Sequence, residues 1–224
     1  GGLLTDNYIN KLIRSNYHNK VNKDIRFSGY LIEIINIMIH ITKAVISLYN
    51  AQICFLDLNT FNIVLINKIP YIIDLEDLLV LNDYKDLINF LDLLTTGTLT
   101  NDVIQSFYDA KFPPEINYYY DQIMTIIREN NNINNINNIN NMIDMVVYED
   151  IREKYSEESE WKKFVNKVMV HRLGILLKFG FENCHVIKGT VKEKFNMLLE
   201  LVLDKDPNKR ITLQEFLVSL ETLH

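Results

Sequence analysis

Apolar residues recur at helical spacing along most of the chain, and the longest apolar run covers residues 30–49. The polar residues inside this run follow one another at steps of three and four, which places them on one stripe of a helix: Glu33, Asn36, His40, Lys43 and Ser47. Charged groups near the centre of a bilayer are costly. The pattern therefore predicts a largely buried helix over about residues 28–49, with one wetter edge, rather than a membrane span.

The same spacing predicts a mainly α protein. Further helices are expected over residues 3–15, 83–94, 101–112, 149–164, 164–179, 191–206 and 212–223. The charged stretch at residues 149–164 predicts a solvated helix whose Trp161 packs against the domain. TTGTLT at residues 95–100 is expected to break one helix, and Pro113 and Pro114 are expected to form a rigid stop.

A small β element interrupts the helices. Two short runs rich in β-branched residues, NIVLI at residues 62–66 and PYIIDL at residues 70–75, are separated only by NKI. Runs of this length and composition around a short connector predict a β-hairpin.

A low-complexity tract, NNNINNINNINN, covers residues 130–141. Its isoleucines stand at every third position and could form a weak helical stripe. Asn is a poor helix former, however, and such a segment buries little apolar surface, so we expect a disordered surface insertion.

Composition and charge narrow the class of protein. The chain has 224 residues, of which 48% are hydrophobic and 23% charged, as in globular proteins. The net charge of −6 and the absence of a compact Lys/Arg cluster argue against a nucleic-acid surface. Only two cysteines occur, and no signal peptide opens the chain, so we expect an intracellular, cytoplasmic protein without disulfides or a membrane partner.

Three polar side chains stand in the apolar sequence around the hairpin: Asp57, Asn62 and Asp74. Strand pairing would bring Asn62 and Asp74 towards a shared point, with Asp57 nearby. Their oxygens suit Mg²⁺, which keeps phosphate oxygens and water as its other ligands. A separate Asp could orient a hydroxyl and accept its proton in phosphoryl transfer. Each residue could instead cap a turn or a strand end.

The order of these residues resembles the catalytic region of the protein kinases. That family has a catalytic loop H-R-D-L-K-x-x-N, then a hairpin and D-F-G; here residues 55–62 read FLDLNTFN and residues 74–76 read DLE. The resemblance implies Mg²⁺ and ATP as cofactors and assigns four roles: Asp57 as catalytic base, Asn62 and Asp74 as metal ligands, and Val64 as a nucleotide-binding residue.

Later elements of the same family follow in its order. Residues 113–115, PPE, resemble the A-P-E element; a central helix over about residues 164–179 contains LGILL, which resembles its counterpart; and closing helices cover about residues 191–223. The resemblance implies a structural ion pair between Glu115 and Arg210. An Asn-rich insertion, about residues 129–142, then separates the PPE element from the central helix.

A second alignment is possible at the central helix. DYKDLINFLDLLTTG, which starts at Asp83, also resembles that helix and would shorten the activation segment to almost nothing. It would leave FPPEI and LGILL unexplained, so we favour the later position.

Several features of the family are missing from the sequence. No Gly-rich loop and no V-A-I-K motif occur in residues 1–224, so we expect a kinase-like large (C-terminal) lobe with the small lobe absent from this chain. The Arg of H-R-D is Leu56, the loop Lys is Asn59, and the Gly of D-F-G is Glu76. The Asp of the central helix is Met169.

Two functions therefore stay open. In the first, this is the large lobe of a divergent serine/threonine protein kinase, which transfers a phosphoryl group from Mg-ATP to a protein hydroxyl when a small lobe completes it, and which is inactive as an isolated chain. In the alternative, it is a pseudokinase-like module that binds a partner protein without catalysis. A purely structural helical domain, in which the motif order is coincidence, is the third hypothesis.

Overall fold

The computed structural model describes residues 2–3, 23–55, 58–73, 75, 78–80, 82–98, 113–130, 136–182 and 189–223. Its helices are α2 (Lys23–Asn50), α3 (Tyr84–Thr98), α5 (Pro114–Asn130), α6 (Ile136–Ile143), α7 (Glu149–Tyr155), α8 (Glu158–Glu182), α9 (Thr190–Leu203) and α10 (Leu213–Leu223). Its strands are β1 (Gly2–Leu3), β2 (Ile53–Phe55), β3 (Ile63–Ile66), β4 (Ile69–Ile72) and β5 (Leu78–Val80). The prediction of a mainly α fold with a small hairpin is confirmed.

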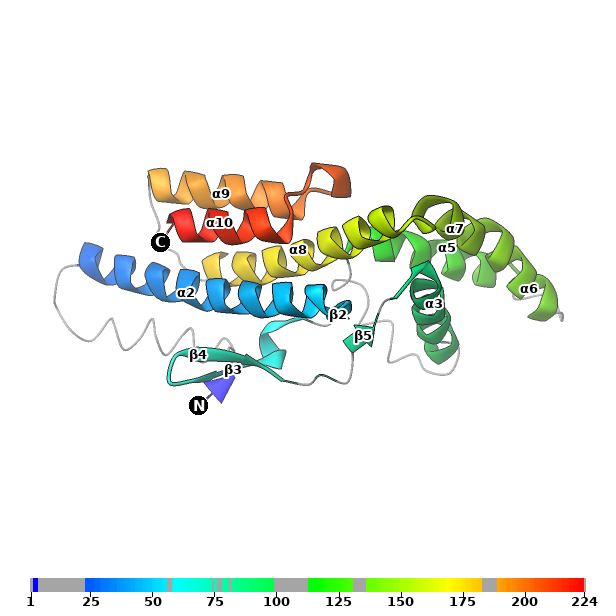
Figure 1. Ribbon diagram of the computed structural model, residues 1–224, viewed down its shortest axis with the longest axis horizontal. Helices are drawn as coiled ribbons and strands as arrows, with labels where there is room; N and C mark the ends of the chain where they lie inside the picture. The colour runs from blue at the N-terminus through cyan, green and yellow to red at the C-terminus, as the bar shows by residue number, and fades with distance from the viewer. Residues whose placement is uncertain are drawn as a thin grey trace.

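Helix α8 lies at the centre of the structure. It packs against α2, α9 and α10, and α10 also packs directly on α2, while α3, α5, α6 and α7 gather at one end (Figure 1). Its apolar side chains are buried along most of its length. The helix predicted over residues 164–179 lies inside α8, whereas the alternative segment from Asp83 falls mainly in α3, which packs against α5 and α7.

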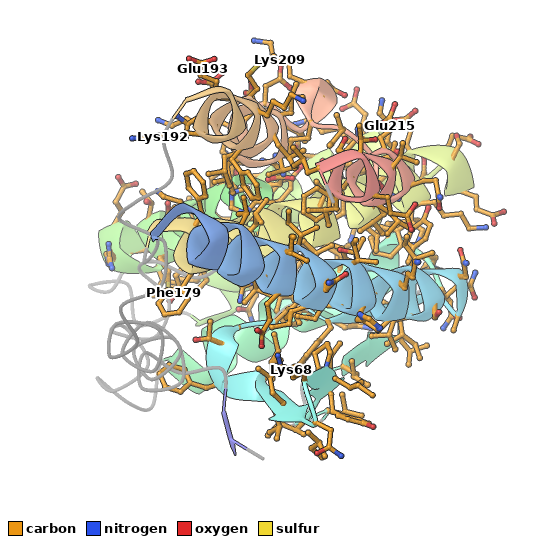
Figure 2. All side chains as sticks on the ribbon, turned by 90° about the vertical axis from the view of Figure 1, so that its left-hand side faces the viewer. Lys68, Phe179, Lys192, Glu193, Lys209 and Glu215 are labelled. Atoms are coloured by element: carbon orange, nitrogen blue, oxygen red, sulfur yellow. The ribbon has the colours of Figure 1, made fainter. Side chains whose placement is uncertain are left out.

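Helices α9 and α10 form the outer layer over α8. Their buried residues face the core, and the charged side chains of Lys192, Glu193 and Glu215 are exposed and point away from it (Figure 2). The turn between them has Asp206 as its cap, whose side chain accepts a hydrogen bond from the Asn208 N–H at 3.0 Å, and Pro207 follows that cap. An Asp followed by Pro suits the start of such a turn.

Helix α2 begins five residues earlier than predicted and ends at Asn50. Residues Leu31–Asn50 are long and apolar enough to cross a membrane, by length and composition alone, which is also true of many core helices in soluble proteins. One side of the helix packs on α8, α10 and the sheet. After its last turn, Gln52 adopts a φ of 60°, and its N–H donates to the Tyr49 carbonyl at 2.9 Å. Glycine is the usual residue at this position, because the conformation is left-handed.

The predicted hairpin is formed by β3 and β4, with Ile63 opposite Ile72 and Ile66 opposite Ile69. Asn67 and Lys68 connect them with φ values of 51° and 68°, as a two-residue hairpin turn requires. Strand β1 pairs with the other edge of β3, so Gly2 and Leu3 are extended rather than helical; residues 4–15 of the predicted first helix lie outside the described residues. The pairing of β2 with β5 was not predicted.

Two predicted helix boundaries are wrong. Helix α3 continues through residues 95–98, where a break was expected. Pro114 is the first residue of α5 rather than a stop. Proline suits that position, since the N–H that it lacks would have no partner inside the helix. The helix predicted over residues 101–112 lies outside the described residues.

The Asn-rich tract is partly helical, which corrects the prediction of disorder for residues 136–141. Ile143 is buried and Ile139 packs against the core, so isoleucines four residues apart give α6 a face that packs on α5. A π-helical segment, Asp144–Tyr148, continues α6 into α7. The charged stretch after residue 149 forms two helices, α7 and the start of α8, and Trp161 is buried as predicted.

Helices α8 and α9 lie close together at Gly174. A Cβ added there would lie 2.6 Å from the Val202 Cγ2 and 2.8 Å from the Leu203 Cδ2. At Gly180, six residues further along α8, the nearest atom to an added Cβ is the Ile34 Cγ2 at 3.5 Å, which is ordinary contact.

We expect Gly174→Ala to lower the free energy of unfolding by about 1–3 kcal/mol, because the two helices must separate to admit the methyl group. The matched variant Gly180→Ala should raise it by roughly 0.5–1 kcal/mol, since alanine is the better helix former and has room. Urea denaturation of both variants measures the difference. Equal effects would show that the α8–α9 contact is not tight.

Candidate functional site

The loop before the hairpin is held by its own polar side chains. Asn59 is the cap of the short 3₁₀ turn Thr60–Asn62, and its Oδ1 accepts hydrogen bonds from the N–H groups of Phe61 at 2.8 Å and Asn62 at 3.3 Å. Leu58 is buried beneath the turn. The carboxamide of Asn59 therefore organises the backbone of this loop.

Asn62 ends this turn and leads into β3, and it is only 6% exposed. Its carbonyl accepts a hydrogen bond from the Ile73 N–H at 2.9 Å, just beyond the end of β4. The hairpin thus brings the loop that contains Asn62 beside the residue that precedes Asp74 in the sequence. Asp57 and Asp74 themselves lie outside the described residues.

Among the described residues, no group of three or more His, Cys, Asp or Glu side chains could hold a metal ion. The predicted ligand set combines one amide with two acids, and the structure describes only the amide, that of Asn62. The buried position of Asn62 suits a ligand, because burial fixes the orientation of the side chain.

The hairpin presents an apolar outer face. Directly opposed residues of antiparallel strands lie on one face, so Val64 shares its face with Tyr71 and Leu3, while Ile63 and Leu65 are buried on the other. Val64 is half-buried. Several large apolar side chains of this region are exposed: Phe61, Ile66, Ile69, Tyr71, Ile73 and Leu75. Exposed apolar groups gathered in this way are typical of surfaces that bind other molecules.

A buried ion pair joins distant parts of the chain. The Arg210 guanidinium donates to both oxygens of Glu115, at 2.5 and 2.9 Å, and the two residues are 2% and 8% exposed. Arg210 also donates to the Asp204 carbonyl at 2.6 Å and to the Lys167 carbonyl at 3.2 Å. The ion pair implied by the kinase resemblance is therefore present, and it fixes the start of α5 against α8 and the turn before α10.

Helix α8 buries further basic residues. Lys167 donates to the Arg210 carbonyl, and His171 and Arg172 are buried one turn further along. Among the described residues, the Nδ1 atom of His171 has no hydrogen-bond partner. Burial, together with the charges of Arg210 and Arg172, lowers the pKa of His171 to about 3. In the sequence, the sign of these buried groups is the adjacent basic pair His171 and Arg172 inside an otherwise apolar helical stretch.

Beside the loop, Cys54 of β2 is buried, and burial raises the pKa of its thiol to about 12 despite the opposing charge of Arg172. A thiol of this kind stays protonated and is no nucleophile. Met169 of α8 is 1% exposed and packs in the core.

No family model, no curated protein and no solved structure matches this chain. The resemblance to the protein kinases thus rests on the motifs of the sequence.

We expect Glu115→Gln to cost about 3 kcal/mol of unfolding free energy, because it leaves the Arg210 charge buried without a counter-charge. The double variant Glu115→Leu/Arg210→Met should recover much of this loss, since neither charge remains. Glu158→Gln, which removes a fully exposed partner of Lys162, is the control and should have almost no effect. Additive losses in the double variant would contradict the prediction.

Below its unfolded pKa of about 6.5, His171 binds a proton in the unfolded chain but not in the folded one. Stability should therefore fall as the pH falls from about 6.5 towards 3, with a slope of up to about 1.4 kcal/mol per pH unit. His171→Leu removes this contribution, so its stability should fall less between pH 7 and pH 5 than that of the parent. Urea denaturation at both pH values tests this, and an unchanged pH dependence would count against it.

Proposed function

We propose that this chain is the large lobe of a divergent serine/threonine protein kinase, which transfers the γ-phosphoryl group of Mg-ATP to a protein hydroxyl when a small lobe completes it. The observation that carries the proposal is the buried Glu115–Arg210 pair. It links residues 95 positions apart, at the places where the kinase pattern has the A-P-E acid and the late arginine. Short motifs recur by chance, but a bidentate buried pair between two of them is a far more specific agreement.

In this proposal the hairpin region performs the chemistry. Asp57 would orient the substrate hydroxyl and accept its proton, and Asn62 and Asp74 would hold Mg²⁺. The hydrogen bond between the Asn62 carbonyl and the Ile73 N–H supports a shared metal site, because Asp74 follows Ile73 in the sequence. Magnesium needs few protein ligands, since phosphate oxygens and water fill its other positions.

The outer face of the hairpin fits the nucleotide side of such a site. Val64 lies on this face with Tyr71, and the apolar side chains around them are exposed in the chain as it stands. An adenine ring and a small lobe would cover this apolar surface. A small lobe packed on this face would explain why so many apolar side chains are exposed there in the chain as it stands.

A pseudokinase-like interaction module is the second candidate. Three features favour it: Leu56 stands where the kinases have an arginine, Asn59 caps a turn where they have a lysine, and Met169 is buried where they have an acid. The loss of two cations weakens the stabilisation of a transferred phosphoryl group. Binding of a partner protein needs none of these residues.

Titration with ATP, with and without Mg²⁺, tests the proposal on the chain itself. If the site is retained, Mg-ATP should raise the unfolding temperature, by the equivalent of about 2.7 kcal/mol at a hundredfold excess over its dissociation constant. Asn62→Ala should abolish the dependence on Mg²⁺ because it removes a ligand oxygen. The matched variant Asn62→Asp keeps an oxygen ligand and should retain it.

A complete lack of nucleotide effect would favour the interaction module. We also expect no phosphoryl transfer by the isolated chain. Transfer to a generic protein substrate that Asp57→Asn abolishes would show that the chain is active without a small lobe, and that this last expectation is wrong.

A further inference from the structure

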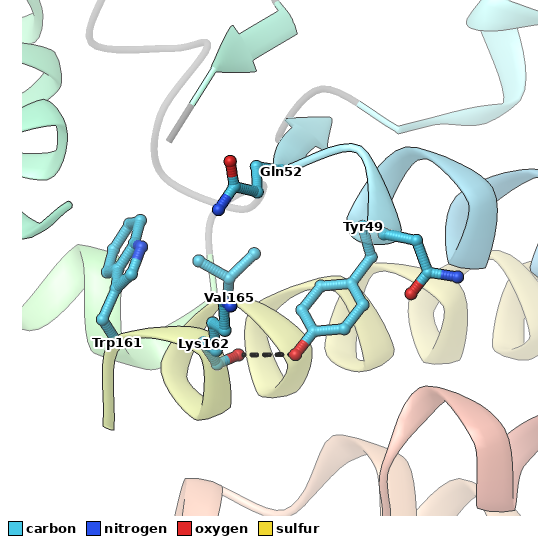
Figure 3. Close-up of a pocket in the computed structure, with 6 residues that line it drawn as sticks. Tyr49, Gln52, Trp161, Lys162 and Val165 are labelled. Atoms are coloured by element: carbon cyan, nitrogen blue, oxygen red, sulfur yellow. Dashed lines mark hydrogen bonds between the residues drawn. The ribbon is translucent and has the colours of Figure 1, made fainter. Parts of the chain in front are cut away.

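A pocket of about 200 Å³ opens between the end of α2 and the first turns of α8, away from the hairpin (Figure 3). Its lining residues are Tyr49, Asn50, Gln52, Trp161, Lys162 and Val165. The Tyr49 hydroxyl donates to the Lys162 carbonyl at 3.3 Å and ties the two helices together along one wall. Sites for small molecules usually measure about 300–1,000 Å³, so this pocket has the size for one large side chain rather than for a cofactor.

The pocket has an apolar part, formed by Trp161 and Val165, and a polar part, formed by the other lining residues. Trp161 is 3% exposed and Val165 is buried, so both are held rigidly by the core. Asn50 and Gln52 are exposed and carry carboxamides, which both donate and accept hydrogen bonds. A pocket with two such parts can take an anchoring side chain and bond the main chain on either side of it.

Gln52 occupies a strained backbone conformation. Its φ is 60°, which glycine adopts without cost, and yet the chain has a glutamine there. Figure 3 shows its side chain reaching over Val165 towards Trp161. A strained residue with an exposed side chain at a pocket indicates that the side chain itself is used.

The only charged residue in the pocket lining is Lys162, but the stretch of chain that leads to Trp161 carries an excess of acids. Residues 149–163 contain six acids and four bases. Each base is engaged by an acid of this region: Arg152 with Asp144 and Glu149, Lys154 with Asp150, Lys162 with Glu158, and Lys163 with Glu160.

Two exposed acids are left over in this stretch. Within the described contacts, neither Glu153 nor Glu157 has an ion pair. The Glu157 carbonyl accepts the Trp161 N–H at 3.0 Å, so this acid stands one turn before the pocket wall. A cationic ligand is therefore favoured here.

We propose that this pocket docks a partner protein by holding one aromatic or aliphatic side chain from a basic segment of that partner. The apolar part takes the side chain, the Gln52 and Asn50 carboxamides bond its backbone, and the excess of carboxylates attracts the flanking Lys and Arg residues. Gln52 directly precedes β2, which leads to the loop at Leu58–Asn62. A docked segment would thus sit one short strand away from the candidate catalytic loop, which suits a substrate as well as a regulatory partner.

Trp161 is the single tryptophan of the chain, so its fluorescence reports on the pocket directly. The probe is the end-blocked peptide Lys-Arg-Phe-Arg-Lys, added without nucleotide. We expect a saturable change in fluorescence, and at least tenfold weaker binding for two control peptides, one with Ala in place of Phe and one with Asp and Glu in place of the bases. No saturable change, or equal binding of either control peptide, would overturn the proposal.

Gln52→Gly separates a docking role from a structural one. It should raise the unfolding temperature, because it relieves the backbone strain, and weaken peptide binding at least fivefold, because it removes the carboxamide. Asn67→Gly changes another residue of positive φ, in the hairpin turn, and should leave binding unchanged. If Gln52→Gly binds as tightly as the parent, the assigned role of Gln52 is wrong. The readout needs no ATP or Mg²⁺, so its failure and that of the proposed kinase chemistry are distinguishable.

Discussion

The arrangement of the helices depends on one buried charge. Arg210 sits in the interior with its guanidinium bonded to both Glu115 oxygens and to the carbonyls of Asp204 and Lys167. Taking a guanidinium out of water is costly, and only such a complete set of partners offsets that cost. Any other packing of α5 against α8 would leave the charge without partners, so the pair specifies one arrangement rather than adding much net stability.

This arrangement also determines where the hairpin lies. With α8 fixed by the ion pair, α2 and β2 pack on its other side, and the sheet packs on α2. The loop that ends at Asn62 follows β2 after a short connection. The two regions of interest, the hairpin with its apolar face and the pocket at Gln52, are thus placed by the same central helix.

Strong periodicity made the long helices predictable, and a short connector between β-rich runs made the hairpin predictable. Strands β2 and β5 have three residues each, too few to show an alternating pattern. The proline pair was misjudged because the same residue that ends a helix also suits its first position. The Asn-rich tract was misjudged because tertiary packing of Ile143 outweighs the weak helix propensity of asparagine. The pocket has no sequence signal, since Tyr49 and Trp161 only become neighbours in the fold.

The position of the Asn-rich tract has a consequence for how its length can vary. The tract lies within the 95-residue stretch of chain that the Glu115–Arg210 pair closes into a loop. The entropy of closing a flexible loop grows only with the logarithm of its length, by about 0.6 kcal/mol per doubling. Gain or loss of a few Asn-Asn-Ile units would therefore change the closure free energy very little. Such simple repeats can drift in number here while the buried salt bridge keeps the helical body intact.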